Sequence, residues 1–269
     1  MVVQISPEIT RRSEGAAQDA TEWQARVDLA AAHRLAVLHD LSEGIFNHLT
    51  MVVPGKADRF LVIPFGLHWS EVTASSFVEV GHDGKILKGQ GEVERSAVSI
   101  HAPIHRINTR AAVVFHTHMP YATALTRLKD SRILPIGQTE IGLMDQIAYD
   151  EHYPGLAHEL DEGERLVEIL GNKSIVFMGN HGVLVIGETV GEAYDRLYYL
   201  ERACRIQLYA IWTQRDLRMV DSAVVSHMRS QRGENYLYGE RKPDRKHCEL
   251  HFDALKRVLD RKEGTDYRT

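Results

Sequence analysis

Three histidines in this chain are spaced so that they could bind a metal ion. His116 and His118 end the apolar run 113–115, for which we expect a β-strand, and strand side chains two positions apart project from the same face. His181 lies in the turn 179–182 between two further apolar runs, where Asn and Gly permit unusual backbone angles. Three imidazoles with an open fourth position suit catalytic Zn²⁺, and Fe²⁺, Mn²⁺ and Ni²⁺ accept similar donors.

Two alternatives to a metal site stay open at this level. The chain has 15 histidines, so a His-x-His pair can also arise by chance. Spacing alone does not show that His181 lies beside His118, 63 positions earlier. A metallo-hydrolase motif would place Asp two residues after the second histidine, and Pro120 occupies that position. The pattern therefore predicts a divalent-metal site and disfavours that hydrolase class.

Short strands and helices must position these histidines. Strand pairs occur without a regular βαβ alternation, which predicts a three-layer α/β/α domain with a central, mainly antiparallel sheet. We expect a loosely ordered arm at 1–22, this domain at 23–213 and a charged helical extension at 214–269. The apolar spacing predicts hairpins at 49–53 with 60–63, 77–80 with 85–87 and 175–178 with 183–186, a strand at 111–118, and helices at 23–41, 97–107, 189–213, 220–232 and 247–259.

Composition excludes several classes of protein. The 269 residues carry 43% apolar and 26% charged types, which is typical of a globular chain. The net charge of −5 argues against nucleic acid as a partner bound by bulk charge. No apolar run approaches the ~20 residues that cross a bilayer, so no membrane partner is expected. Two cysteines are too few for a disulfide framework, which favours a reducing compartment and a cytoplasmic location.

Several motifs together resemble the class II aldolase/adducin family over about residues 23–213. They are the stretch 113–124 with its two histidines, the turn 179–182 and the helix start at 187–189. Segments 47–50, 63–67, 71–76 and 134–138 are most similar to the adducin-like branch. The resemblance implies a homo-oligomer, usually a cyclic tetramer with the metal site near a subunit boundary. It also implies that His116, His118 and His181 are the metal ligands.

The resemblance implies a reaction in which Zn²⁺ acts as a Lewis acid and stabilises an enediolate, while an acidic side chain moves the proton. The family acid lies four residues before a histidine that matches His101, and this chain has Ala97 there. The usual family tyrosine is His105. If the helix extends backward, Glu94 lies one turn earlier and is the first candidate for a displaced acid/base. Glu140 is the second candidate for the acid/base. The alternative for both residues is a solvated surface charge.

The segments that would hold substrate are also altered. Sugar-phosphate aldolases often have a Gly-Asn-x-Ser-x-Arg-like loop, and in the corresponding residues of this chain Thr50 keeps a hydroxyl while Val52 lacks the cation. A phosphorylated substrate is therefore less expected. Gly66 would allow close backbone approach to an anion, although a turn glycine needs no ligand. His48 is predicted either to contact substrate or to be a structural histidine.

Two functions follow from these observations. The first is a metal-dependent, aldolase-like lyase or isomerase acting on a small hydroxy-carbonyl or sugar-acid substrate. The second is a non-catalytic, adducin-like metal-binding assembly module. The chain has no long basic tail after residue 213, which favours the enzyme. Tyr149 and Tyr153 are candidates for proton donors at a neighbouring active site, with packing as the alternative role.

Overall fold

An eight-stranded sheet forms the centre of the molecule, in the order β4-β3-β2-β1-β5-β8-β7-β6. The computed structural model describes residues 7–153, 155, 161–233 and 245–269. In this part of the chain β6 pairs with β7 in parallel and the other strand pairs are antiparallel. The strands are β1 (His48–Val53), β2 (Lys56–Val62), β3 (Val78–Gly81), β4 (Ile86–Lys88), β5 (Val113–Thr117), β6 (Ile147–Asp150), β7 (Ile175–Met178) and β8 (Gly182–Gly187).

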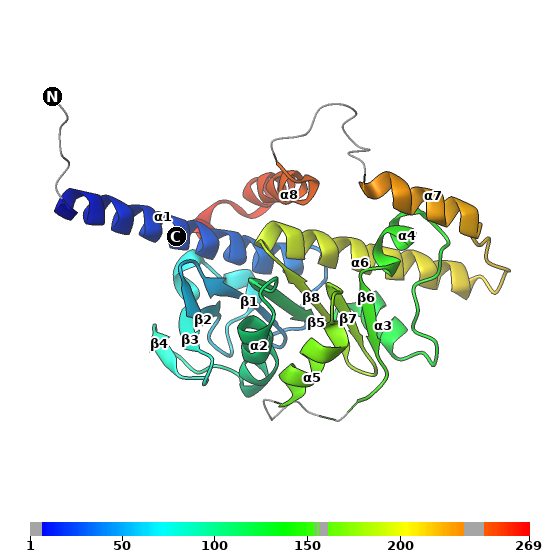
Figure 1. Ribbon diagram of the computed structural model, residues 1–269, viewed down its shortest axis with the longest axis horizontal. Coiled ribbons are helices and arrows are strands. Elements are labelled where there is room, and N and C mark those ends of the chain that lie inside the picture. The colour runs from blue at the N-terminus through cyan, green and yellow to red at the C-terminus, as the bar shows by residue number, and fades with distance from the viewer. Residues whose placement is uncertain (1–6, 154, 156–160, 234–244) are drawn as a thin grey trace.

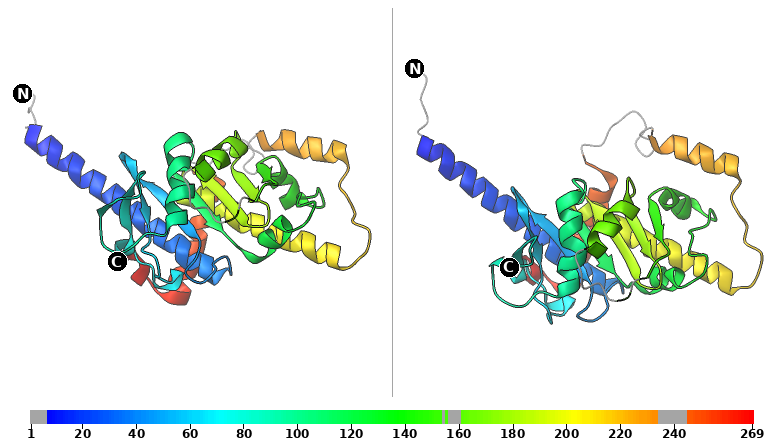
Figure 2. Two further views of the ribbon diagram at one scale, coloured as in Figure 1. Left: turned by 90° about the horizontal axis from the view of Figure 1, so that it is seen from below. Right: turned by 60° about the horizontal axis from the view of Figure 1, so that its bottom comes forward.

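Helices cover both faces of the sheet, which confirms the predicted α/β/α architecture. Helices α2 and α5 pack on one face, and α1 and α6 pack on the other (Figures 1 and 2). Alternation along β5 serves both layers, because Val113 and Phe115 join the core under α1 and α6 while Val114 joins the core under α2 and α5. The helices are α1 (Pro7–Leu38), α2 (Arg95–Ile107), α3 (Pro120–Thr126), α4 (Gln138–Met144), α5 (Asp161–Leu170), α6 (Val190–Trp212), α7 (Ser222–Gly233) and α8 (His247–Glu263).

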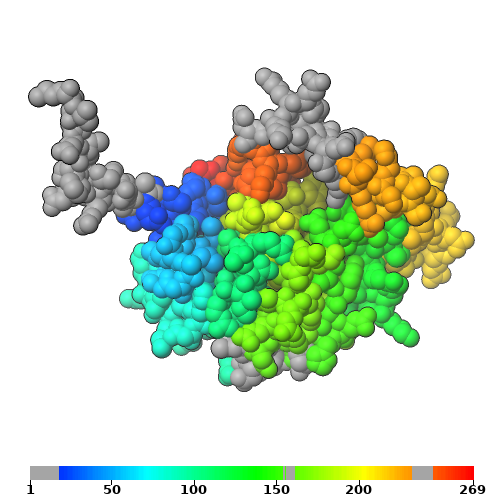
Figure 3. All heavy atoms as spheres, viewed as in Figure 1, coloured from blue at the N-terminus to red at the C-terminus, as the bar shows by residue number. Residues whose placement is uncertain are grey.

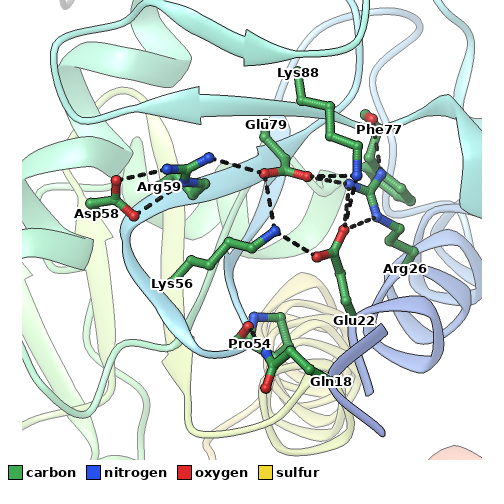
Figure 4. A network of polar contacts seen from close by, with 10 residues as sticks. All are labelled: Gln18, Glu22, Arg26, Pro54, Lys56, Asp58, Arg59, Phe77, Glu79 and Lys88. Carbon is green, nitrogen blue, oxygen red and sulfur yellow. Dashed lines mark hydrogen bonds and ion pairs between the residues drawn. The ribbon is translucent and has the colours of Figure 1, made fainter. Parts of the chain in front are cut away.

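The N-terminal segment differs from the prediction. Residues 1–6 lie outside the described part, and the chain is helical from Pro7, so the expected loose arm is corrected over 7–22. A polar network attaches α1 to the sheet (Figure 4). The Arg26 guanidinium lies 3.0 Å from both Glu22 and the buried Glu79 of β3, and Lys56 lies 2.9 Å from Glu22. Because a buried carboxylate is costly without its cations, this network ties α1 to β2 and β3.

The C-terminal part matches its predicted elements. Thr189 accepts a hydrogen bond from the Glu192 backbone N–H at 3.1 Å, which begins α6 as the capping pattern indicates. Helices α7 and α8 occupy the two predicted ranges, and part of the predicted extension, 234–244, lies outside the described residues. Helix α8 packs over α6 and α1 (Figure 3). No helix in the described part of the chain is long and apolar enough to span a membrane.

Candidate metal centre

The structure brings His116, His118 and His181 together. One ring nitrogen from each lies within 4.8 Å of one from each of the others. The ring centroids form a nearly equilateral triangle, with separations of 5.0 Å for His116 and His118, 4.8 Å for His116 and His181, and 4.9 Å for His118 and His181. Strand β5 supplies His116, and the turn between β7 and β8 supplies His181 beside it because β8 pairs with β5.

Hydrogen bonds on the far side of the rings orient two of these histidines. Nδ1 of His116 donates to the Val183 carbonyl oxygen at 3.0 Å, and Nδ1 of His118 donates to Glu43 Oε2 at 2.5 Å. Each bond leaves the lone pair on Nε2, and this arrangement is typical of metal-binding histidines. Nε2 of His118 is buried and has no hydrogen-bond partner among the described residues. The donor set therefore fits a divalent transition metal.

Burial keeps His116 and His181 in the neutral form that a metal requires. Desolvation lowers the pKa of His116 well below its ordinary value, and the neighbouring His181 and His118 lower it further. Desolvation, followed by the proximity of His118, lowers the pKa of His181 to about 4. Both rings are consequently unprotonated at neutral pH and offer lone pairs without first losing a proton.

The loop before β1 supports the same site. Asn47 adopts φ = 73°, a left-handed conformation that Asn tolerates, and its Oδ1 accepts a hydrogen bond from the His118 backbone N–H at 2.9 Å. Glu43 lies on the same loop, where the Phe46 N–H donates to the Glu43 carbonyl at 3.0 Å. One short segment thus holds His118 through both its ring and its backbone. Glu43 and Asn47 lie 75 and 71 positions before His118, and no spacing in the sequence predicts this role for them.

A buried carboxylate on α6 holds the segment that follows His118. Glu201 accepts hydrogen bonds from the backbone N–H groups of Tyr121 and Ala122, each at 2.8 Å, at the start of α3. Desolvation raises the pKa of Glu201 to about 7, although the two backbone hydrogen bonds oppose that shift. A carboxylate at this helix start also complements the helix dipole. This contact fixes the position where the chain leaves the histidine cluster.

A cavity of about 790 Å³ opens onto the three histidines, and Glu94 lines it. Glu94 Oε2 accepts a hydrogen bond from His48 Nε2 at 2.7 Å, and its Oε1 accepts one from the Ser96 hydroxyl at 3.0 Å. The hydrogen bond from His48 lowers the pKa of Glu94, so the group is a carboxylate at neutral pH. His48 also lines the cavity, and it is the hydrogen-bond donor to Glu94 there.

Glu94 lines the cavity from a backbone position that differs from the predicted one. Helix α2 begins at Arg95, and Glu94 is its N-cap with extended backbone angles, so the helix does not continue back to it. Ala97 is fully buried in an apolar cluster with Phe60 and Val80 and faces the sheet. The position of the family acid is therefore filled by core packing in this chain.

Thr50 does not contact the cavity, which corrects its prediction as a substrate-binding residue. It is fully buried beneath α2, where its hydroxyl lies 2.7 Å from His101 Nδ1 and 2.8 Å from His105 Nε2. Nδ1 of His105 donates to the Ala111 carbonyl, so the Thr50 hydroxyl donates to His105 and accepts from His101. The hydroxyl is consequently used to hold α2 on β1.

Two further predicted residues also lie away from the cavity. Gly66 does not line it, and its φ of 91° explains why a glycine is present without a ligand. Glu140 is buried on α4, which packs against α6 on the opposite side of the sheet from α2. Its prediction as a second acid/base is therefore wrong, because β5 directs His116 toward the α2 side.

The two tyrosines have different surroundings. The Tyr149 hydroxyl accepts a hydrogen bond from the Ile133 N–H at 3.1 Å, and its ring packs edge-on against Phe177, so it serves packing. Tyr153 is 45% exposed, lines the cavity of its own chain and has its ring centroid 6.0 Å from that of His181. Phe46, which sequence reasoning missed, also lines the cavity.

The structure is thus an α/β/α sheet domain in which a histidine triad opens onto a cavity and forms a candidate metal centre. The family model described as Class II Aldolase and Adducin N-terminal domain matches residues 27–208. The chain belongs to the class II aldolase/adducin family. This result confirms the resemblance identified from the motifs.

Relatives in this family include both aldolase-named proteins and adducins. A Caulobacter vibrioides protein with the name "Putative aldolase class 2 protein" is 36% identical over 214 residues, which cover 79% of this chain and 82% of that protein. Alpha-adducin of Mus musculus is 32% identical over 267 residues, which cover 96% of this chain and 36% of the adducin. The chain therefore matches little more than a third of an adducin.

Solved structures show the same fold. The aldolase II superfamily protein from Pseudomonas syringae superposes with a TM-score of 0.82 at 36% identity, covering 92% of this chain and 96% of that one. An L-fuculose 1-phosphate aldolase from Glaciozyma antarctica PI12 superposes with a TM-score of 0.76 at 21% identity, covering 94% of each chain. At that identity, the second likeness shows the fold alone.

Proposed function

We propose that this chain is a metal-dependent lyase or isomerase that acts on a small hydroxy-carbonyl or sugar-acid compound. Zn²⁺ is the metal that we propose for the site. The observation that carries the proposal is the histidine triad, whose donor nitrogens lie within 4.8 Å of one another and face a cavity that also contains Glu94. Three histidines with room for a further ligand are the pattern of catalytic rather than structural zinc. When bound, the ion would supply a Lewis acid that polarises a carbonyl oxygen.

The chain's own residues supply the proton chemistry. Glu94 is ionised at neutral pH, lies on the cavity wall and is held by His48 and Ser96 in one orientation. We infer that isomerisation begins when the C–H bond next to the carbonyl breaks. Its proton moves to a Glu94 oxygen, its electron pair forms the C=C bond of an enediolate as the carbonyl π pair moves onto oxygen, and return of the proton to the former carbonyl carbon completes the reaction. In lyase activity Glu94 instead takes the proton of a hydroxyl on the β carbon, whose O–H pair forms a new C=O bond; the pair of the broken Cα–Cβ bond forms the enediolate, and the α carbon then recovers the proton from Glu94.

The metal site is tested by elemental analysis of protein purified without a histidine tag. We expect about one divalent ion per chain, and we expect the His116→Ala/His181→Ala double variant to lose it. The His152→Ala variant is the matched control, because His152 lies outside the triad and its ring has no role in the site. Unchanged metal content in the double variant, with the fold confirmed by circular dichroism, would show that the site is misassigned.

An adducin-like assembly module is the second candidate, favoured by the alpha-adducin match over 96% of this chain. The two functions differ in whether the metal-loaded protein turns over a substrate. A screen of hydroxy acids and sugar phosphates separates them when the Glu94→Gln variant is included. Turnover that depends on Glu94 supports the enzyme, and metal binding without turnover of any compound in the screen supports the module.

We also propose a homotetramer in the cytoplasm. An exposed stripe on the last turns of α6 supports the oligomer, since Ile206, Tyr209 and Trp212 are 41%, 48% and 64% exposed on one helix face. Aromatic residues are enriched in the buried centres of subunit interfaces. Both cysteines, Cys204 and Cys248, are free thiols, which is compatible with a reducing compartment.

A further inference from the structure

The cavity next to the histidine triad has an aromatic wall that the proposed reaction does not use. Phe46 lines this cavity and is 51% exposed, although a phenyl ring is usually buried. Its position is tied to the metal site, because the Phe46 N–H donates to the Glu43 carbonyl at 3.0 Å and the Glu43 carboxylate holds His118. The ring is therefore presented beside the triad by the loop that orients one of its ligands.

Tyr153 supplies a second aromatic surface. Its ring is 45% exposed and inclined by 55° to that of His181, with 6.0 Å between the centroids. Ile100 also lines the cavity, and Gly44 and Gly155 contribute no polar side chain. Phe46, Tyr153 and Ile100 thus give the cavity an apolar and aromatic surface, next to lining residues that are polar or charged: Glu43, Asn47, Arg95 and Ser96.

Among the described residues that line the cavity, groups that would hold a phosphate are not gathered together. Thr50 is bonded beneath α2, Gly66 lies elsewhere, and Val52 carries no charge. Among the described lining residues, Arg95 is the one side chain of the Lys or Arg type. Phosphate sites usually combine several charged or backbone N–H donors. The described part of the cavity therefore offers metal-ligating groups and, beside them, aromatic and apolar surface.

We propose that the substrate is a hydroxy-carbonyl compound whose non-reacting end is an apolar, ring-sized group packed against Phe46, rather than a phosphate ester. This inference rests on the proposed function, because it places the hydroxy-carbonyl end at the triad. A volume of about 790 Å³ falls in the range of small-molecule sites and accommodates a substituted ring. Phe46 is the specificity-determining residue in this proposal, since such a group would cover its exposed ring.

The test measures binding to the zinc-loaded, full-length protein by calorimetry. The probes are acetohydroxamate, phenylacetohydroxamate and phosphoglycolohydroxamate, which share a metal-chelating group and differ at the other end. We expect the phenyl compound to bind at least about tenfold more tightly than the methyl compound, from aromatic contact and apolar burial. We also expect it to bind more tightly than the phosphate compound.

Two variants test whether Phe46 causes the preference for the phenyl compound. Phe46→Ala should reduce the phenyl-to-methyl affinity ratio to about one, while zinc content and acetohydroxamate affinity stay unchanged. Phe65→Ala is the matched control, because Phe65 is 45% exposed and 6.5 Å from Phe46 between ring centroids but does not line the cavity. A ratio that Phe65→Ala leaves intact and Phe46→Ala abolishes supports the proposal.

The results that would overturn the proposed substrate class differ from those that would overturn the proposed function. If the protein binds no zinc, the proposed function fails first. If zinc and acetohydroxamate bind but the phenyl compound gains nothing, or the phosphate compound binds most tightly, the substrate class is wrong. If Phe46→Ala leaves the affinity ratio unchanged and instead alters the oligomer size in light scattering, Phe46 belongs to a subunit contact and the proposal is overturned.

Discussion

Glu43 provides the sharpest test of how this chain would hold a metal. Its carboxylate accepts a hydrogen bond from His118 Nδ1 at 2.5 Å, which fixes the ring and leaves Nε2 to coordinate. Partners of this kind typically contribute 10- to 100-fold in metal affinity, or about 1.4 to 2.8 kcal/mol. The Glu43 side chain is 54% exposed, so water screens its charge. We therefore expect Glu43→Ala to weaken zinc binding by about tenfold, at the lower end of that range.

Competition with a zinc-binding dye measures this effect without any assay of activity. Glu43→Gln retains an acceptor without the charge, so we expect an intermediate loss. Glu92→Gln is the matched control, since Glu92 is an exposed carboxylate on the loop before α2 and does not line the cavity. Thermal unfolding of the metal-free proteins checks that the fold is intact. Zinc affinity in Glu43→Ala equal to that of the parent and of Glu92→Gln would refute the assignment of Glu43 as an orienting residue.

Three further predictions address catalysis, stability and assembly. Glu94→Gln should lower turnover by about 10²- to 10⁴-fold with metal content unchanged, and an unchanged rate would exclude Glu94 as the base. Burial lowers the pKa of His33 to about 4, so its contribution to stability is full above pH 6.5 and is lost as pH falls toward 4. Urea unfolding should show about 2 kcal/mol less stability at pH 5 than at pH 7 from this group, a difference that His33→Leu removes and that equal pH dependence in both proteins would contradict. Light scattering should report a tetramer that Trp212→Ala shifts toward smaller species, and a monomeric parent at micromolar concentration would contradict the proposed assembly.

Local signals in the sequence were sufficient for most elements of the fold. Hairpins and helix starts depend on neighbouring residues, and the Thr189 cap forms between residues three apart. Alternation along β5 likewise directs the side chains of His116 and the following His118 to the same face of the sheet. Four short helix and strand segments between 120 and 170, including β6, were not predicted, because short segments carry little periodicity.

The part of the candidate site that depends on local signals was also predicted from the sequence. The triad combines a local His-x-His pair with a turn histidine, and the family motifs supplied their association. Glu43 lies 75 positions before His118, and His48 lies 46 positions before Glu94, so no spacing rule connects them. These contacts arise because β1 pairs with β5 and places His48 opposite His116 in register.

Local periodicity, turn chemistry and family motifs are therefore enough to predict most of the elements, the layered architecture and the identity of the clustered histidines. The side of the sheet that each polar residue faces becomes visible in the folded chain. Thr50 is directed under α2 and Glu140 lies with α6, while Glu94 reaches the cavity as an N-cap. The physical reason is that helix packing on the two faces of the sheet, and not spacing along the chain, determines which side chains share a cavity.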